Sequence, residues 1–210
     1  MADTSDMYAV HRVFRDALEA APSYVGGADS DARRVELVGG YYDNVLALLA
    51  VHHEGEDLLL WPRLLERLPD SADRIRAVAD QHGDLHDLLP AARAAVAQWV
   101  ASPDDTTEAA LLAAIDALAV PLLRHLDQEE EVILPLAAQV ITAPEWGEMP
   151  EHGTQNYDGD KLWLVLGLLR ENLTQEQRDL MIEHMPPPAV EFWTQTGEGL
   201  YRDYVRQLRA

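Results

Sequence analysis

The chain has 210 residues, 48% of them hydrophobic, so it can bury one sizeable core but is short for two full domains. Its 37 Asp and Glu residues outnumber 16 Lys and Arg, which gives a formal net charge of -21. Such a charge repels a phosphate backbone, and we expect no nucleic-acid partner. The chain contains no cysteine, so any metal must be held by nitrogen and oxygen.

The hydropathy pattern predicts neither a signal peptide nor a membrane span. The N-terminal segment carries Asp3 and Asp6 where a signal peptide has basic residues. The apolar stretches 45–51 and 118–123 are much shorter than the ~20 residues that cross a bilayer. We therefore expect a cytoplasmic protein that does not contact a membrane.

Two long helices are predicted in the first third of the chain. In the first, Met7, His11, Phe14 and Leu18 recur every three to four residues, and a Gly-Gly pair follows. The second is expected over about residues 31–67, where apolar residues form one stripe, with a bend at Pro62.

Two further helices complete the predicted bundle. The third follows a turn at residues 69–71 and should kink at Pro90, and the fourth follows a break at 102–104, where Asp105 and Glu108 resemble a capping box. The apolar period continues beyond Pro121, so one helix is kept there. Four amphipathic segments joined by short turns predict an all-α, up-and-down four-helix bundle over residues 1–142.

Residues 143–210 differ in character, because prolines and glycines separate short apolar stretches. Short helices are expected here, one of them capped by Thr174 with Gln177 as its partner. We interpret this region as a helical C-terminal extension that packs on the bundle or on a second subunit, in a monomer or homodimer.

Histidines and glutamates recur on the inward stripes of all four predicted helices. Residues four apart on a helix share a face, so three of these sets are two-point chelates, and the first helix adds a single ligand. One such pair is more often a core or surface feature, but convergence of all four stripes favours a metal site, since two metal ions would compensate both buried carboxylates. The candidate ligands are His11, His52, Glu56, His82, His86, His125 and Glu129.

Other polar residues near these stripes are given lesser roles. His53 points about 100° away from His52, so we expect it at the surface or behind the ligands. Asp57 and Glu130 are expected on solvated faces. Tyr42 could hydrogen-bond a bound oxygen species or relay an electron, although a plain core aromatic is the simpler interpretation.

The donor set suits iron, manganese, zinc or copper, and ligand type alone does not choose among them.

The segments around His52-x-x-x-Glu56 and His125-x-x-x-Glu129 also share one spacing from the glutamate to a following proline. Two of the predicted bundle helices therefore carry the same His-x-x-x-Glu pattern, followed by a proline at the same distance.

The ligand series resembles that of the haemerythrin-like (HHE cation-binding) family, in its bacterial and actinobacterial form, over about residues 7–140. The resemblance implies two iron ions joined by an oxo or hydroxo bridge, with manganese or zinc as possible substitutes. It also implies that His82, His86 and His125 hold one iron, His11 and His52 hold the other, and the two glutamates bridge both.

By this resemblance the second iron keeps an open position for O2, NO or hydrogen peroxide, as in proteins of oxidative or nitrosative stress. Oxygen-carrying members have His-x-x-x-x-Asp where this chain has His125-x-x-x-Glu129, so reversible oxygen carriage is only one option. The alternatives are a catalase-like, peroxidase or O2-dependent oxidase or oxygenase activity on an unknown small substrate, and iron storage or handling.

Overall fold

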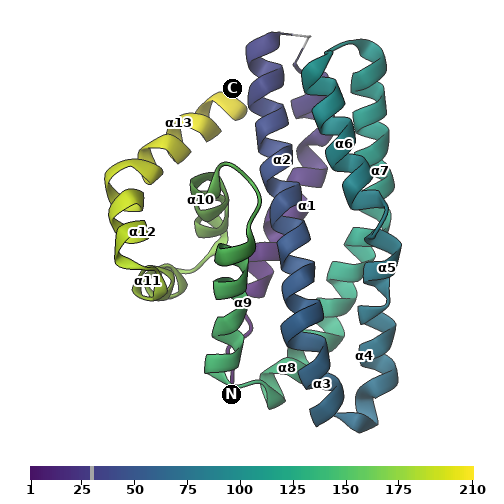
Figure 1. Cartoon of the computed structure of the whole chain (residues 1–210), viewed down its shortest axis with the longest axis vertical. Coiled ribbons are helices and arrows are strands. Elements are labelled where there is room, and N and C mark those ends of the chain that lie inside the picture. The colour runs from purple at the N-terminus through teal and green to yellow at the C-terminus, as the bar shows by residue number, and fades with distance from the viewer. Residues whose placement is uncertain (29–30) are drawn as a thin grey trace.

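Four long helical rods form the body of the molecule, and Figure 1 shows how they lie alongside one another. The computed structural model describes residues 1–28 and 31–210, and no strand occurs among them. Around the bundle, α1 contacts α2, α2 contacts α6, α6 contacts α7, and α7 returns to α1. The predicted all-α four-helix bundle is confirmed. In chain order the rods are α1 (Met7–Gly26); α2 (Ala32–Gly55) with η1 (Glu56–Leu60) and α3 (Trp61–Arg67); α4 (Ala72–Ala79), α5 (Gln81–Leu85) and α6 (Leu88–Ala101) after the turn η2 (Pro69–Ser71); and α7 (Asp105–Gln128) with η3 (Glu129–Ile133) and α8 (Leu134–Val140).

The fourth rod begins one residue earlier than the sequence suggested. Asp104 is the N-cap of α7, and its carboxylate accepts from the backbone N–H of Thr106 and Thr107. Thr107 completes the capping box, so the predicted pairing of Asp105 with Glu108 was wrong. As expected, α7 continues through Pro121 as one helix.

The third rod is interrupted twice instead of kinking only at Pro90. Breaks fall at Asp80 and at the turn formed by His86 and Asp87. Pro90 has no N–H and its ring clashes with the carbonyl four residues earlier, which is that of His86. The regular helix therefore breaks before the proline, and α5 is short.

The C-terminal extension lies along one side of the bundle (Figure 1). Its α9 packs on α2, α10 packs on both α1 and α2, and α13 packs on α10 and α2. Leu164, Leu168, Trp193 and Tyr201 belong to the same buried cluster as the apolar residues of α1, α2, α6 and α7. The extension therefore shares the core of the bundle. Its elements are α9 (Ala143–Asn156), α10 (Leu162–Asn172), α11 (Gln175–His184), α12 (Pro187–Phe192), η4 (Trp193–Gly197) and α13 (Glu198–Leu208).

A buried amide on α2 fixes the segment between α9 and α10. The Asn44 side chain is 0% exposed; its oxygen accepts from the hydroxyl of Tyr157 at 2.6 Å and from the backbone N–H of Lys161 at 2.7 Å. Its amide nitrogen donates to Asp160. Because a buried amide is costly without partners, these bonds hold the extension at one position along α2.

The run Asp105–Val140 is long and apolar enough to cross a membrane by length and composition. Its buried face, however, includes Leu111, Leu118, His125 and Glu129, which pack inside the bundle. The core helix of a bundle meets the same criteria, so this run alone does not indicate a membrane span.

Candidate metal centre

Both helices with the His-x-x-x-Glu spacing change geometry at the glutamate. A π-turn begins at Glu56 and another at Glu129, and their carbonyls accept from the backbone N–H of Trp61 and Leu134, five residues on. In each case the next residue is proline, which cannot donate to the regular α-helical acceptor. The repeated glutamate-to-proline spacing therefore predisposes both helices to the same π-turn, a feature often found at functional sites.

The four rods bring two groups of metal-type ligands together at one level of the bundle. In each group, one donor atom per residue lies within 4.8 Å of all the others. The first group comes from α1, α2 and the two π-turns, and the second from α2, η1, α5 and α7. The first group is His11, His52, Glu56 and Glu129, and the second is His53, Glu56, His82 and His125.

The two carboxylates lie between histidines of both groups. Glu56 has one oxygen 3.4 Å from Nε2 of His52 and the other 3.3 Å from Nε2 of His82. One oxygen of Glu129 lies 3.2 Å from Nε2 of His11 and 3.6 Å from Nε2 of His125. This is the arrangement expected of carboxylates that bridge two neighbouring cations.

The centre is closed to solvent, and several of its ligand atoms have no hydrogen-bond partner. Glu56 and Glu129 are 0% exposed, and none of their four carboxylate oxygens has a hydrogen bond. The same is true of Nε2 of His11, His52 and His53. Burying an uncompensated ion costs several kcal/mol, so the unpartnered oxygens and nitrogens together fit bound cations. The histidines and glutamates of the two groups are the residues of this chain that could hold a metal.

Burial and mutual charge give these groups distinct pKa values in the metal-free chain. Burial lowers the pKa of His52 to about 3 and that of His125 to about 4, so both imidazoles are neutral near pH 7 with lone pairs free for a metal. Burial and the nearby charge of Glu129 raise the pKa of Glu56 well above its ordinary value.

His11 and Glu129 form the charged pair of the metal-free centre. Burial lowers the pKa of His11, but the charges of Glu129 and Glu130 outweigh it and raise the value to about 9. Burial raises the pKa of Glu129, yet the neighbouring imidazolium of His11 holds it below its ordinary range. A proton on His11 thus occupies the place that a cation would take.

Two carboxylates behind the ligands orient their histidines. Nδ1 of His11 lies 2.9 Å from Glu130, which also accepts from Arg15 at 3.1 Å. Nδ1 of His82 lies 2.8 Å from Asp57. A carboxylate at Nδ1 fixes the proton there and aims the Nε2 lone pair at the metal. Asp57 and Glu130 therefore do more than cover solvated faces, and a carboxylate adjacent in sequence to a ligand was the available signal.

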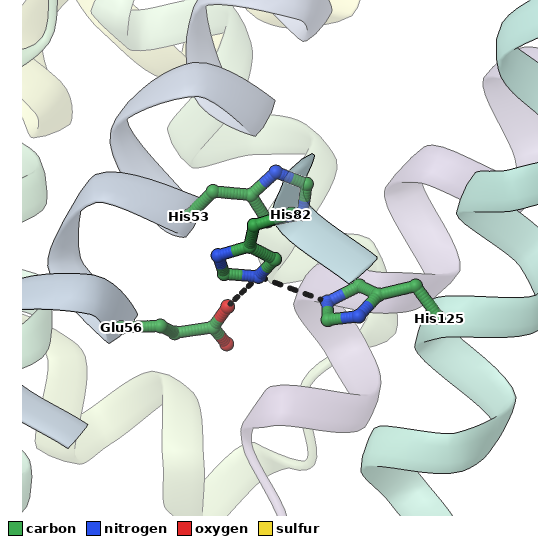
Figure 2. Close-up of side chains that lie close together, drawn as sticks. All are labelled: His53, Glu56, His82 and His125. Atoms are coloured by element: carbon green, nitrogen blue, oxygen red, sulfur yellow. Dashed lines mark hydrogen bonds and ion pairs between the residues drawn. The ribbon is translucent and has the colours of Figure 1, made fainter. Parts of the chain in front are cut away.

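The structure brings six of the seven predicted ligands together and leaves the seventh, His86, outside both groups. His86 ends α5 with an exposed side chain and belongs to neither group. His53, expected at the surface or behind the ligands, is 7% exposed and stacks on His82 with ring centroids 4.3 Å apart. Figure 2 shows His53, Glu56, His82 and His125 gathered at this position. The surface assignment of His53 was wrong.

Tyr42 is a core residue of α2 and belongs to neither group of ligands. It is 2% exposed, and its hydroxyl donates to the carbonyl of Ala17 at 2.9 Å. Burial raises its pKa above the ordinary value, so the phenol stays protonated at neutral pH. Because its hydroxyl is already bonded to the backbone, the geometry favours the simpler interpretation as a core aromatic.

The bundle and its convergent histidines and glutamates define a helical metal-binding protein. A family model described as Hemerythrin HHE cation binding domain matches residues 2–137, and the chain belongs to this family. The matched range covers the four rods except the end of α8 and leaves out the extension. Comparisons with curated proteins and with solved structures found no match.

Proposed function

We propose that the chain is a non-haem diiron protein that binds or reacts with O2, NO or hydrogen peroxide. One ion would be held by His11 and His52, and the other by His53, His82 and His125, with the two glutamates between them. The observation that supports two ions is that Glu56 presents its two oxygens to histidines of different groups, at 3.4 and 3.3 Å.

Bound iron would supply electron exchange and a coordination position for a small ligand. The chain's own residues provide neutral imidazoles, a dry surrounding and two anionic carboxylates. Five imidazoles with only two carboxylates give few anionic donors to stabilise high-valent iron. This balance favours ligand binding or mild redox chemistry over attack on strong carbon–hydrogen bonds.

Metal content and ligand binding test this proposal directly. We expect two iron ions per chain after anaerobic loading, and a new optical band when the reduced protein meets NO. A stable, reversible O2 spectrum would favour carriage, whereas rapid peroxide turnover would favour the enzyme. One iron per chain, or no spectral response to any of the three molecules, would contradict the proposal.

A matched pair of variants tests whether His53, and not His86, binds a metal ion. His53→Ala should lose one of the two ions, because it removes a buried imidazole stacked on His82. His86→Ala should keep both, because that side chain is exposed and outside the groups. Metal per folded chain, measured after circular dichroism confirms folding, decides between them. Loss of metal in His86→Ala with full occupancy in His53→Ala would restore the sequence-based set.

The cellular setting completes the proposal. We expect the protein in the cytoplasm. We also expect a monomer or homodimer, since the extension already covers part of α1 and α2 within one chain. Cell fractionation and light scattering test these two points, and recovery in the membrane fraction or as a higher oligomer would count against them.

A further inference from the structure

An apolar cavity of about 20 Å³ lies between α1, α2 and α7, apart from the metal ligands. We propose that this cavity is a docking position for a small apolar diatomic gas on its way to the metal centre. This proposal rests on the proposed function. The cavity is lined by Phe14, Ala17, Leu18, Tyr42, Val45, Leu46, Leu49, Ile115, Leu118 and Leu122.

The lining excludes water as the natural occupant. A water needs roughly 10–15 Å³ and two to four polar partners, and apolar cavities without such partners stay dry. Here every lining side chain is apolar except Tyr42, whose hydroxyl already donates to Ala17. The space therefore has room for a molecule of about two heavy atoms and offers it dispersion contacts only, which suits O2 or NO and disfavours hydrogen peroxide.

The cavity lies one helical turn from the metal ligands on three different helices. Phe14, Leu49 and Leu122 each line it, and each lies three residues before or after a ligand on its own helix. The ring of Phe14 lies 5.5 Å, centroid to centroid, from the ring of His52. The ring of Phe14 thus lines the cavity and also lies next to His52 of the first ligand group.

Leu18 marks the side from which a gas would enter. It is half-buried, whereas the other nine lining residues are buried. A change of rotamer at Leu18, the lining side chain that is nearest to solvent, would open the cavity without unfolding. The cavity then acts as an apolar waiting position that concentrates gas beside the centre and keeps water out.

Xenon tests the cavity independently of the metal chemistry. Crystals of the purified protein under xenon pressure should show one xenon atom within this lining. Val45→Ile adds one methyl group beside the space and should remove the xenon, while Val38→Ile, seven residues earlier on the same helix and outside the lining, should retain it. Absence of xenon from the unaltered protein, or its persistence in Val45→Ile, would overturn the docking position.

Stopped-flow mixing of the reduced, iron-loaded protein with NO tests the route. Val45→Ile should slow NO association severalfold and leave the iron content unchanged, and Val38→Ile should match the unaltered protein. Xenon binding with an unchanged association rate in Val45→Ile would overturn the route. Failure of every form to bind NO would instead refute the proposed function. The xenon result would still decide whether the cavity binds a small apolar molecule.

Discussion

The charge pair of the metal-free centre predicts an unusual loss of stability at mildly alkaline pH. The pKa of His11 is about 9 in the folded chain against 6.5 as the ordinary value. A group whose pKa is raised by folding contributes stability that is complete below the unfolded pKa and is lost as pH rises through the folded one. The difference corresponds to at most roughly 3 kcal/mol of unfolding free energy between pH 6.5 and 9.

The neighbouring groups do not reverse this sign. Glu56 also has a raised pKa, so its contribution falls as pH rises as well. His52 and His125 have lowered pKa values, and their contributions change below 6.5, where the unfolded chain gains protons. The metal-free protein should therefore be most stable near pH 6.5 and less stable on both sides.

Urea unfolding of the chelator-treated protein from pH 6 to 9.5 measures this loss. Glu129→Gln should make the alkaline slope shallower, because it removes a charge that raises the pKa of His11, whereas Glu131→Gln, an exposed neighbour, should leave the slope unchanged. Metal loading should flatten the curve, since a cation replaces the proton. The reasoning is refuted by a metal-free protein whose stability is constant or rises from pH 6.5 to 9.

Three further outcomes follow from single contacts. Glu130→Gln should lower metal affinity by about 10- to 100-fold in chelator competition, because it weakens the orientation of a ligand histidine, and unchanged affinity would contradict this. Gly167→Ala should cost about 1–3 kcal/mol in urea unfolding, since its Cβ would overlap the ring of Tyr201. The control Gly153→Ala, with open space at its Cβ, should stabilise helix α9 by up to ~1 kcal/mol; equal effects would argue against the packing of α13 on α10. Asn44→Ala should cost about 1–3 kcal/mol and speed proteolysis within residues 157–161, and unchanged resistance would contradict its anchoring role.

The interior faces of the bundle were predictable because helical periodicity is a local property. His52 with Glu56 and His125 with Glu129 lie in helices that stay regular up to the glutamate, so four-residue spacing fixed their shared face. The same rule did not bring His86 into the centre, because α5 ends there, before Pro90. The proline was visible in the sequence, but the position of the break depends on how the helix packs.

The inclusion of His53 follows from the geometry of a four-helix bundle. Each helix of such a bundle has two neighbours about a quarter-turn apart, and consecutive helical residues are separated by about 100°. Two adjacent residues can therefore face two different neighbours. His52 lies 5.5 Å from the ring of His11 on α1, and His53 stacks on His82 of α5 at 4.3 Å. Treating only one stripe of α2 as interior missed this second inward direction.

The repeated π-turns explain how one helix can serve both metal and core. In each π-turn the backbone hydrogen bond spans five residues instead of four, which shifts the following side chains around the helix relative to a regular α-helix. After Glu56 the inward positions pass to Leu60 and Trp61, and after Glu129 they pass to Ile133 and Leu134, all at most 4% exposed. In each helix the glutamate is thus the last residue of the ligand-bearing face. The π-turn before the proline begins an apolar face, which closes one end of the centre. Because this depends on proline spacing and not on particular ligands, the same closure would hold whichever metal the chain binds.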